Sequence, residues 1–471
     1  MRATTLAERP PNNAPTLQAS PAAPPAAASA SASGASALAS PRGRDKTNRS
    51  IAPEALRAHW SLDPAITFLN HGSYGATPTE VQFVQQELRR RIERDPVRFY
   101  KVDLEPLMDE MRERLAGFLN CDAEGLAPFP NATQAIGTIL HSIPWQAGDE
   151  VVVTDHEYMS LVNELRRLEV TRGIRVVTAS IPFPLPEATT TPRELAESVT
   201  RLITSRTRLV AFSWITSATS LVLPAGEIVQ SCNARGVDVL VDGTHAPGQI
   251  PVDIASLAPT YFVGSGHKWL STPKGVGFLW AAPQVREQIR PLALSSRAHK
   301  VRADRSLFLR DFDYHGTSDV SGVLCLPAAI DFYERSLGFS GFREVMSRNA
   351  LAIREARSML ARRLAPLGVT PGVGPQATDA GDDPFTGTMA SFLLPEPAPA
   401  MLSRPTRYDD PLQDALVDAH RVQIPVWRLA SDNRRVFRVS AQVYNSPEDY
   451  QRLADALEQE LTFEQGGSPR G

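Results

Sequence analysis

Three short segments of the sequence place reactive side chains where a strand or a helix would expose them. The first is Val241-Asp242-Gly243-Thr244-His245, in which a carboxylate ends an apolar run. A buried carboxylate needs a positive partner, because desolvation otherwise neutralises it. A protonated pyridine nitrogen would be such a partner and would make its ring an electron sink, with His245 in reach of a ring oxygen. Asp242 alone is also consistent with a strand-end cap or a divalent-metal ligand.

The second segment is Gly264-Ser265-Gly266-His267-Lys268. Its lysine follows an apolar run and two glycines, at the exit of a predicted strand rather than on a solvated helix face. A lysine near a cation or away from water has a lowered pKa and becomes a nucleophile toward carbonyl groups. Ser265 and His267 add a hydroxyl and an imidazole that suit a phosphate. A surface lysine in a turn is the alternative interpretation.

The third segment, Pro130-Asn131-Ala132-Thr133, opens a helical pattern. Free backbone N–H groups at a helix start, together with the Thr133 hydroxyl, form a site for an anion. Asn131 or Thr133 could equally be no more than an N-cap. Each segment is ambiguous by itself, so their order along the chain carries the stronger signal.

The elements that must position these segments follow from alternating apolar runs and helix-length segments. Strands are predicted at Glu150–Thr154, Ile174–Ile181, Leu209–Ile215, Val237–Asp242 and Tyr261–Ser265. Helices such as Leu161–Arg172 and Glu194–Ser205 separate most of them, which predicts a parallel sheet covered on both faces. Gly275–Trp280 follows too closely for a crossover helix and is predicted to pair antiparallel. Ligands of such sheets lie at the carboxyl ends of the strands, where Asp242 and Lys268 stand.

The sequence beyond residue 320 follows a different pattern. Its predicted elements are helices at Val323–Leu337, Gly341–Leu367 and Pro447–Leu461, strands near Met389–Leu394, Gln423–Arg428 and Val436–Ser440, and loops over 371–387 and 395–412. This pattern predicts a small α+β domain over residues 321–465, beside a large domain over 55–320. Residues 1–54 are rich in Pro, Ala and Ser and are predicted to be a disordered tail rather than a targeting peptide, and 466–471 a disordered end.

The order Asn-Ala-Thr, Asp-x-x-His and Ser-x-His-Lys resembles the class V aminotransferase family of fold-type I pyridoxal phosphate enzymes. Within it, the chain is most similar to the isopenicillin N epimerase-like branch. Supporting segments extend over about residues 60–460 and are Phe68–Ala76, Asp95–Phe99, Asp155–Tyr158, Gly316–Asp319, Arg438–Ser440 and Tyr444-Asn445. The resemblance implies an α/β fold with a mostly parallel, seven-stranded sheet covered by helices and a smaller C-terminal α+β domain.

The resemblance also implies roles for single residues. Lys268 would bind pyridoxal 5′-phosphate as a Schiff base and move protons at Cα, while Asp242 would pair with the pyridine nitrogen and His245 would contact the phenolic oxygen. The other cofactor contacts would be Ala132, Thr133, Ser265 and His267 at the phosphate, Tyr158 or, as second choice, His156 stacked on the ring, and Thr317 at the phosphate of a neighbouring subunit in a homodimer. The substrate side would hold Arg438 on the α-carboxylate, with Asn70, His71 and Arg98 near it.

The resemblance does not determine which bond of the amino-acid substrate breaks. Epimerisation or racemisation at Cα is the working hypothesis, and transamination or C–S β-elimination are the alternatives. Epimerisation calls for a second base, for which Tyr74, His71 and His315 are candidates. None of the three cysteines lies in a Gly/Ser-flanked loop, which argues against a desulfurase that forms a persulfide on its own cysteine.

Two further protein classes are weighed against this hypothesis. A non-catalytic binding subunit of the same fold would lack Lys268 or Asp242, and both are present. A metal-dependent hydrolase that uses Asp242, His245 and His267 would respond to chelators and would show no cofactor absorbance.

Composition excludes several partners. A net charge of -3 and a pI of about 6.3 provide no basic field for nucleic acid, and no apolar run is long enough to cross a membrane. Three cysteines without CxxC spacing fit neither a disulfide framework nor a structural zinc site and suit a reducing cytoplasm. We therefore expect a cytoplasmic homodimer that acts on a small amino-acid substrate and binds no structural or catalytic metal.

Overall fold

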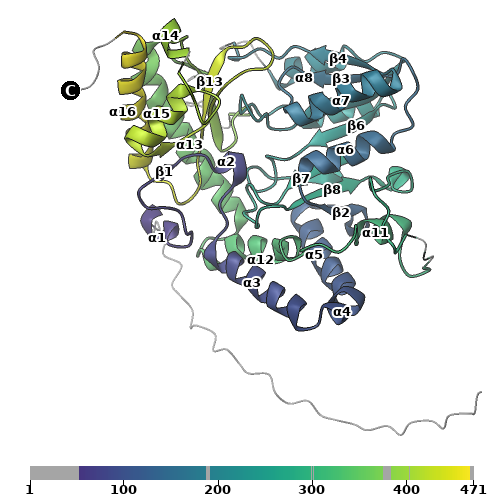
Figure 1. Cartoon of the computed structure of the whole chain (residues 1–471). Helices are drawn as coiled ribbons and strands as arrows, with labels where there is room; N and C mark the ends of the chain where they lie inside the picture. Colours follow the sequence, from purple (N-terminus) through teal and green to yellow (C-terminus); the bar gives the residue numbers. More distant parts are fainter. Residues whose placement is uncertain are drawn as a thin grey trace, which may run out of the picture. The chain divides into compact units, whose positions relative to one another are not determined.

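A seven-stranded sheet lies at the centre of the computed structural model, which describes residues 52–186, 191–298, 300, 302–374, 383–402 and 404–466 (Figure 1). Its order is β2-β8-β7-β6-β5-β3-β4. The strands are β2 (Leu126–Phe129), β3 (Glu150–Thr154), β4 (Arg175–Ala179), β5 (Thr207–Ser213), β6 (Asp238–Asp242), β7 (Tyr261–Ser265) and β8 (Gly277–Ala281). Strands β3 to β7 pair parallel and β8 pairs antiparallel with β7, which confirms the predicted α/β fold.

Helices cover this sheet on both faces. Every residue of β3 and β7 is buried, as is nearly every residue of β5 and β6, which requires cover for both sets of alternating side chains. The helices of this part are α3 (Thr79–Arg94), α4 (Pro96–Arg98), α5 (Leu104–Leu119), α6 (Ala132–Ser142), α7 (Met159–Arg172), α8 (Pro192–Thr200), α9 (Ala225–Asn233), α10 (Ile254–Leu257), α11 (Leu307–Phe312) and α12 (Leu326–Asp331). Because the strands run parallel, the ends of β3, β5, β6 and β7 meet at one edge, where the site lies.

Strand β2 is an element that the sequence analysis did not predict. It is short and contains Pro128, which lacks the N–H that an inner strand would donate. The strand lies at the edge of the sheet and pairs only with β8, so the missing donor is tolerated there.

The C-terminal part holds a second sheet with its own apolar core. This sheet has the order β12-β13-β10-β9 and is antiparallel. Its elements are β9 (Thr370–Pro371), β10 (Met389–Leu393), β12 (Val426–Arg428), β13 (Arg435–Ser440), α13 (Phe342–Leu364), α14 (Pro399–Leu402), α15 (Pro411–His420) and α16 (Pro447–Glu464). Helices α13, α15 and α16 gather beside β13, apart from the large sheet (Figure 1), and enclose side chains such as Leu360, Phe392 and Leu457.

Three predicted elements of this part differ in the structure. The single helix predicted at Val323–Leu337 is a 3₁₀ turn, then α12 and then a π-helical turn, because Pro327 can stand only in the first turn of a helix. The strand predicted at Gln423–Arg428 is split into β11 (Val422–Gln423) and β12, since Pro425 between them has no N–H for a ladder. The loop predicted over 395–412 contains α14 and the start of α15.

The N-terminal segment of the described chain joins the C-terminal part. It consists of α1 (Pro53–Arg57), β1 (Thr67–Phe68) and α2 (His71–Tyr74), and β1 pairs parallel with β11. Residues 1–51 of the tail predicted over 1–54 lie outside the described residues, and residues 53 and 54 begin α1. Of the end predicted over 466–471, the residues after 466 lie outside the described residues. The division into domains at residue 320 stays a prediction. No helix within the described ranges is long and apolar enough to cross a membrane.

Candidate active site

The three reactive segments converge on one cavity. The inner cavity, of about 180 Å³, is lined by Ala132, Thr133, Tyr158, Asp242, His245, Ser265, His267 and Lys268, among others. It adjoins an outer cavity of about 580 Å³, and Lys268 and Tyr158 line both. The outer cavity also contains Arg438, which comes from β13 of the C-terminal part. Residues as far apart in the sequence as Ser73 and Arg438 therefore share one site.

Lys268 is placed just beyond the end of β7 by a close approach of two backbones. Gly75, with φ +66°, packs against the carbonyl groups of His267 and Lys268, and a Cβ at Gly75 would come within 2.0 Å of the His267 oxygen. Desolvation, with the positive charge of Arg438 second, lowers the pKa of Lys268 to about 7, although Asp242 acts in the opposite direction. Near neutral pH a large share of the amine is thus unprotonated and nucleophilic.

Asp242 ends β6 and is 6 % exposed. Its Oδ1 accepts a hydrogen bond from the backbone N–H of Thr244 at 2.9 Å, and no cationic side chain of the described chain forms an ion pair with it. Desolvation therefore raises the pKa of this carboxyl. A buried carboxylate without a cation, at the floor of a cavity, fits a protonated ring nitrogen as its missing partner.

The start of α6 forms the anion-binding end of the inner cavity. The Asn131 side chain caps the helix by accepting the N–H of Gln134 at 2.9 Å, and no hydrogen bond within the described chain uses the N–H groups of Ala132 and Thr133. Gly277 of β8 allows this approach, because a Cβ there would lie 2.9 Å from the Asn131 backbone. Ser265 lies beside these groups and fits a phosphate.

His267, also at this end, has one ring nitrogen already engaged. Its Nδ1 lies 2.9 Å from the Val276 carbonyl and donates to it, and desolvation lowers the pKa of the ring to about 4. The neutral ring then has no proton on Nε2. His267 can donate from Nε2 to a phosphate only as imidazolium, so the anion itself must raise the pKa of His267.

Arg438 differs from the other fully buried arginines. Arg112, Arg357 and Arg435 each form ion pairs with one or more acids, whereas no acidic side chain of the described chain pairs with Arg438. The Arg438 guanidinium donates to the Ser217 carbonyl at 2.7 Å and to Ser73 Oγ at 3.0 Å, while its Nε has no partner. Desolvation lowers its pKa to about 10. A buried cation without an anion is costly, which makes Arg438 a candidate for binding a carboxylate.

The predicted ring-stacking residues have different surroundings. Tyr158 is 53 % exposed and lines both cavities, so it is free to stack on a ring. His156 lines only the outer cavity, and both its ring nitrogens have partners, Thr219 Oγ1 at 2.7 Å and the Ile181 carbonyl at 3.0 Å. The structure favours Tyr158 over His156 for this role.

The three residues predicted beside Arg438 on the substrate side lie around or outside the site. Asn70 is buried behind Arg438, and its Oδ1 accepts from Arg438 Nη2 at 3.4 Å. His71 lines neither cavity, because its ring nitrogens contact Tyr444 Oη at 2.8 Å and the Lys268 carbonyl at 3.0 Å. Arg98 lies on α4 at the surface near Asp103, outside both cavities.

Thr317 lies outside both cavities of its own chain and contacts Tyr314 Oη at 2.6 Å. Of the candidate second bases, only Tyr74 lines the cavities; His71 is engaged as described, and His315 packs against Phe129 and Phe312. The substrate-side assignments of His71 and Arg98 and the second-base assignments of His71 and His315 stay predictions, since none of these residues lines the inner or the outer cavity of the one chain.

The sequence analysis missed several residues of the site. Ser73 and Ser217 hold Arg438, and Trp269 contacts His245. Glu157 is buried next to the cavities, where desolvation raises its pKa to about 7 although Ser213 and Thr154 donate hydrogen bonds to it. Its position in the loop after β3 was the only available signal, because Ser213, the partner on β5, is 56 positions away in the sequence.

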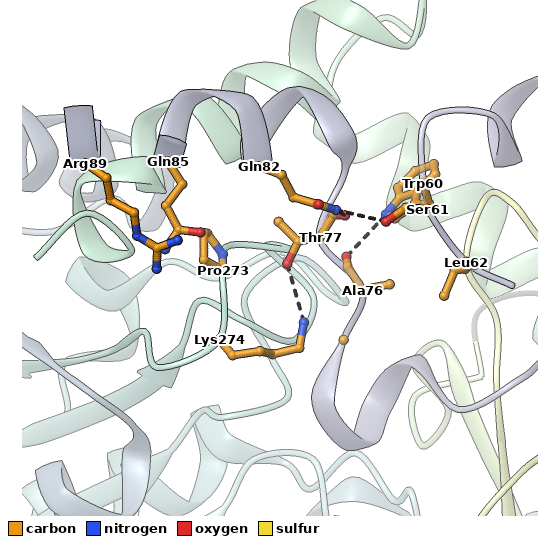
Figure 2. A pocket seen from close by; sticks show the side chains of 11 residues that line it. Trp60, Ser61, Leu62, Ala76, Thr77, Gln82, Gln85, Arg89, Pro273 and Lys274 are labelled. Carbon is orange, nitrogen blue, oxygen red and sulfur yellow. Dashed lines mark hydrogen bonds between the residues drawn. The ribbon is translucent and has the colours of Figure 1, made fainter. Parts of the chain in front are cut away.

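A separate cavity of about 510 Å³, lined by Trp60, Thr77 and Lys274 among others (Figure 2), shares no lining residue with the inner and outer cavities. Lys274 Nζ reaches toward Thr77 Oγ1 there, at 3.4 Å, and Gln82 bonds to Ser61 at 3.2 Å. Within the described residues, no group of three or more His, Cys, Asp or Glu side chains is arranged to hold a metal ion.

The fold and the site define a class. The chain belongs to the aminotransferase class-V family, which matches residues 97–365. Its fold is that of the fold-type I enzymes, and pyridoxal 5′-phosphate is the cofactor, both as the sequence analysis predicted. The fit rests on Asp242 without a cation, on the free start of α6 and on the lowered pKa of Lys268.

Individual relatives differ in their reactions. The chain is 36% identical over 415 residues to isopenicillin N epimerase from Amycolatopsis lactamdurans, covering 86% of this chain and 97% of that protein. It is 26% identical to the probable chloroplastic L-cysteine desulfhydrase of Arabidopsis thaliana, over 84% of this chain and 83% of that one. Among solved structures, the Escherichia coli cysteine desulfurase CsdA is similar, with TM-score 0.69 and 19% identity over 88% of this chain and all of that chain.

Proposed function

We propose that this chain is an epimerase or racemase that inverts Cα of an amino-acid substrate, with pyridoxal phosphate as cofactor and Lys268 as the residue that holds it before the substrate amine takes its place. The observation that carries the proposal is Arg438, a buried guanidinium without an acid, in the same cavity as the amine of Lys268. A substrate carboxylate would supply the missing anion with two parallel N–H···O bonds. The name of the Amycolatopsis relative supports the reaction type.

The side chains of the site have separate tasks in this proposal. Pyridoxal phosphate supplies an electron sink that stabilises negative charge at Cα. Asp242 would keep the pyridine nitrogen protonated, and Ser265, His267, Thr133 and the Ala132 N–H would hold the phosphate. Lys268 removes or returns the proton at Cα, for which a pKa near 7 is well suited.

The volume of the outer cavity favours a substrate with an extended side chain. About 580 Å³ lies next to Lys268 and Arg438, within the range of sites that hold drug-sized ligands, and a cysteine side chain would fill little of it. Its wall includes Trp427 and Tyr158 beside Asp155 and Asn163, so it offers both apolar and polar contacts. Tyr74 and Tyr158, which line both cavities, are candidates for delivering the second proton that inversion at Cα needs.

C–S β-elimination is the second candidate, because one relative is named an L-cysteine desulfhydrase. A desulfurase that forms a persulfide on its own cysteine is disfavoured. Cys121, Cys232 and Cys325 line neither cavity, and desolvation raises the pKa of each thiol to about 12, so none is a reactive thiolate.

We further propose a homodimer in which Thr317 serves the site of the partner subunit. This is supported by the exposed position of Thr317 outside the cavities of its own chain. Mixing a Thr317→Ala subunit with a Lys268→Ala subunit would restore phosphate anchoring in one of the two sites of a hybrid dimer.

The deciding experiment incubates cofactor-loaded protein with L-cysteine, isopenicillin N and the common L-amino acids in deuterated water. We expect deuterium at Cα with inversion of configuration, and no exchange in Lys268→Ala. Pyruvate, sulfide and ammonia from cysteine would identify a lyase, and a keto acid would identify a transaminase. Absence of Cα exchange with every substrate, in protein that holds the cofactor, would contradict the proposal.

A further inference from the structure

Trp269 follows the reactive lysine directly and connects to it through a histidine. Its indole is 1 % exposed, and its Nε1 lies 3.2 Å from Nδ1 of His245. The other ring nitrogen of His245, Nε2, lies 3.0 Å from Nζ of Lys268. The three side chains therefore form a line of hydrogen bonds that ends on the lysine amine.

The chemistry of the indole determines where the protons of this line lie. An indole N–H can only donate, so Nδ1 of His245 must present its lone pair to Trp269. Desolvation, with the charges of Lys268, Arg438 and His267, lowers the pKa of His245 well below its ordinary value, and the ring stays neutral. A neutral imidazole carries one proton, which must then be on Nε2 and point at Lys268.

An ammonium group has three N–H groups and no lone pair, so it cannot accept a hydrogen bond from Nε2–H, whereas a neutral amine can. We propose that Trp269 is a positioning residue that fixes the Nε2–H form of His245 and thereby holds Lys268 as the free, nucleophilic amine. The inference rests on the proposed function in one respect, that this amine forms the bond to the cofactor aldehyde. The same Nε2–H would then be available to a ring oxygen of the bound cofactor.

Replacing Trp269 by Phe removes the N–H donor and part of the ring volume, but it keeps an aromatic ring beside His71, whose ring centroid lies 5.2 Å from that of Trp269. The other groups that act on Lys268 stay in place: Asp242 on β6 and Arg438 on β13. Without the indole N–H, His245 can move its proton to Nδ1 and accept from an ammonium at Nε2. The protonated form of Lys268 then becomes more stable, and its pKa rises.

The test measures the ionisation of Lys268 in apoprotein without using the cofactor. Acetic anhydride labels unprotonated amines, and mass spectrometry of a digest quantifies labelling of each lysine between pH 5 and pH 10. We expect the Lys268 midpoint to lie near 7 in the native chain and to rise by about one to two pH units in Trp269→Phe, the size of one hydrogen bond to a charged group. The midpoint of Lys274, read in the same digest, stays unchanged.

Two further variants test whether Trp269 acts on Lys268 through His245 or through a general change in packing. Trp280→Phe removes an indole that donates to the Asp122 carbonyl at 3.1 Å, outside the inner and outer cavities, and should leave the Lys268 midpoint unchanged. In a His245→Ala chain, Trp269→Phe should add no further shift, since Trp269 acts only through the imidazole. The inference is overturned if Trp269→Phe leaves the Lys268 midpoint unchanged. It is also overturned if Trp269→Phe shifts that midpoint as much in the His245→Ala chain as in the native chain.

A separate titration with pyridoxal phosphate, followed by its visible absorbance, tests the proposed function. A chain that takes up the cofactor but shows no shift contradicts only the role of Trp269. A chain that shows the shift but never takes up the cofactor contradicts only the proposed function. Should Trp269→Phe fail to fold, as judged by circular dichroism, Trp269→Leu replaces it in the same labelling experiment.

Discussion

Replacing Arg438 should separate substrate binding from stability. Its guanidinium is 1 % exposed and pairs with no acid of the described chain, so its main partner would be the substrate carboxylate. Two hydrogen bonds between charged groups are each worth about 1.5–3 kcal/mol. Arg438→Met should therefore weaken substrate binding by about 3–6 kcal/mol, or roughly 10²- to 10⁴-fold.

The same substitution should cost little stability. It removes hydrogen bonds to the Ser217 carbonyl and Ser73 and a contact with the Trp427 ring at 5.2 Å. It also removes the desolvation cost of a buried cation, a cost that lowers the pKa of Arg438 to about 10. These effects oppose one another, so the net loss should not exceed about 1 kcal/mol.

Arg435 on the same strand is the matched control. It donates to Asp410 at 2.6 and 2.7 Å and to Glu464 at 2.7 and 2.9 Å, and both acids are buried. Arg435→Met would leave two carboxylates buried without a partner and should lose about 3–5 kcal/mol of unfolding free energy.

Urea denaturation measures the unfolding free energy of both variants, and the visible absorbance of the cofactor-loaded protein reports substrate binding in a titration. The Arg438 variant should keep the cofactor and lose the substrate, whereas the Arg435 variant should lose stability first. Equal destabilisation by the two substitutions, or native substrate affinity in Arg438→Met, would refute the reasoning.

Two other predictions follow from buried groups. Asp242→Asn should retain the cofactor but slow deuterium exchange at Cα by about 10- to 150-fold. The reason is that an amide lacks the negative charge of the carboxylate, so the protonated pyridine loses the stabilisation of one charged hydrogen bond. Exchange at the native rate would show that Asp242 does not have this role. Deleting residues 1–51 should change the unfolding free energy by less than about 1 kcal/mol. The control substitution Trp60→Ala should lower the unfolding free energy by about 3–5 kcal/mol. The reason is that the Trp60 ring packs on the Tyr444 ring, with centroids 4.9 Å apart, and its indole N–H donates to the Ala76 carbonyl. Urea titrations compare the two chains, and a deletion as damaging as the substitution would show that the first 51 residues contribute to the folded state.

Much of the large sheet could be predicted from the sequence because its signals are local. The five predicted apolar runs appear as strands β3, β4, β5, β6 and β7, and each ends within a few residues of the predicted point. The rule that ligands bind at the carboxyl ends of parallel strands then brings Asp242 and Lys268 together without knowledge of the packing. Elements interrupted by proline, such as β2 and the split between β11 and β12, were missed or merged, since their pairing depends on neighbours that are distant in sequence.

Only the tertiary structure determines the surroundings of Arg438 and the line of hydrogen bonds from Trp269 through His245 to Lys268. Ser217 and Ser73 are 221 and 365 positions from the arginine they hold, and no local pattern links them. Arg435 and Arg438 are three residues apart on β13, so their side chains point to opposite faces of the strand. One face meets Asp410 and Glu464, and the other meets the cavity with Lys268. The sequence determines that two arginines alternate on a strand, but only packing determines which of them is left without an anion.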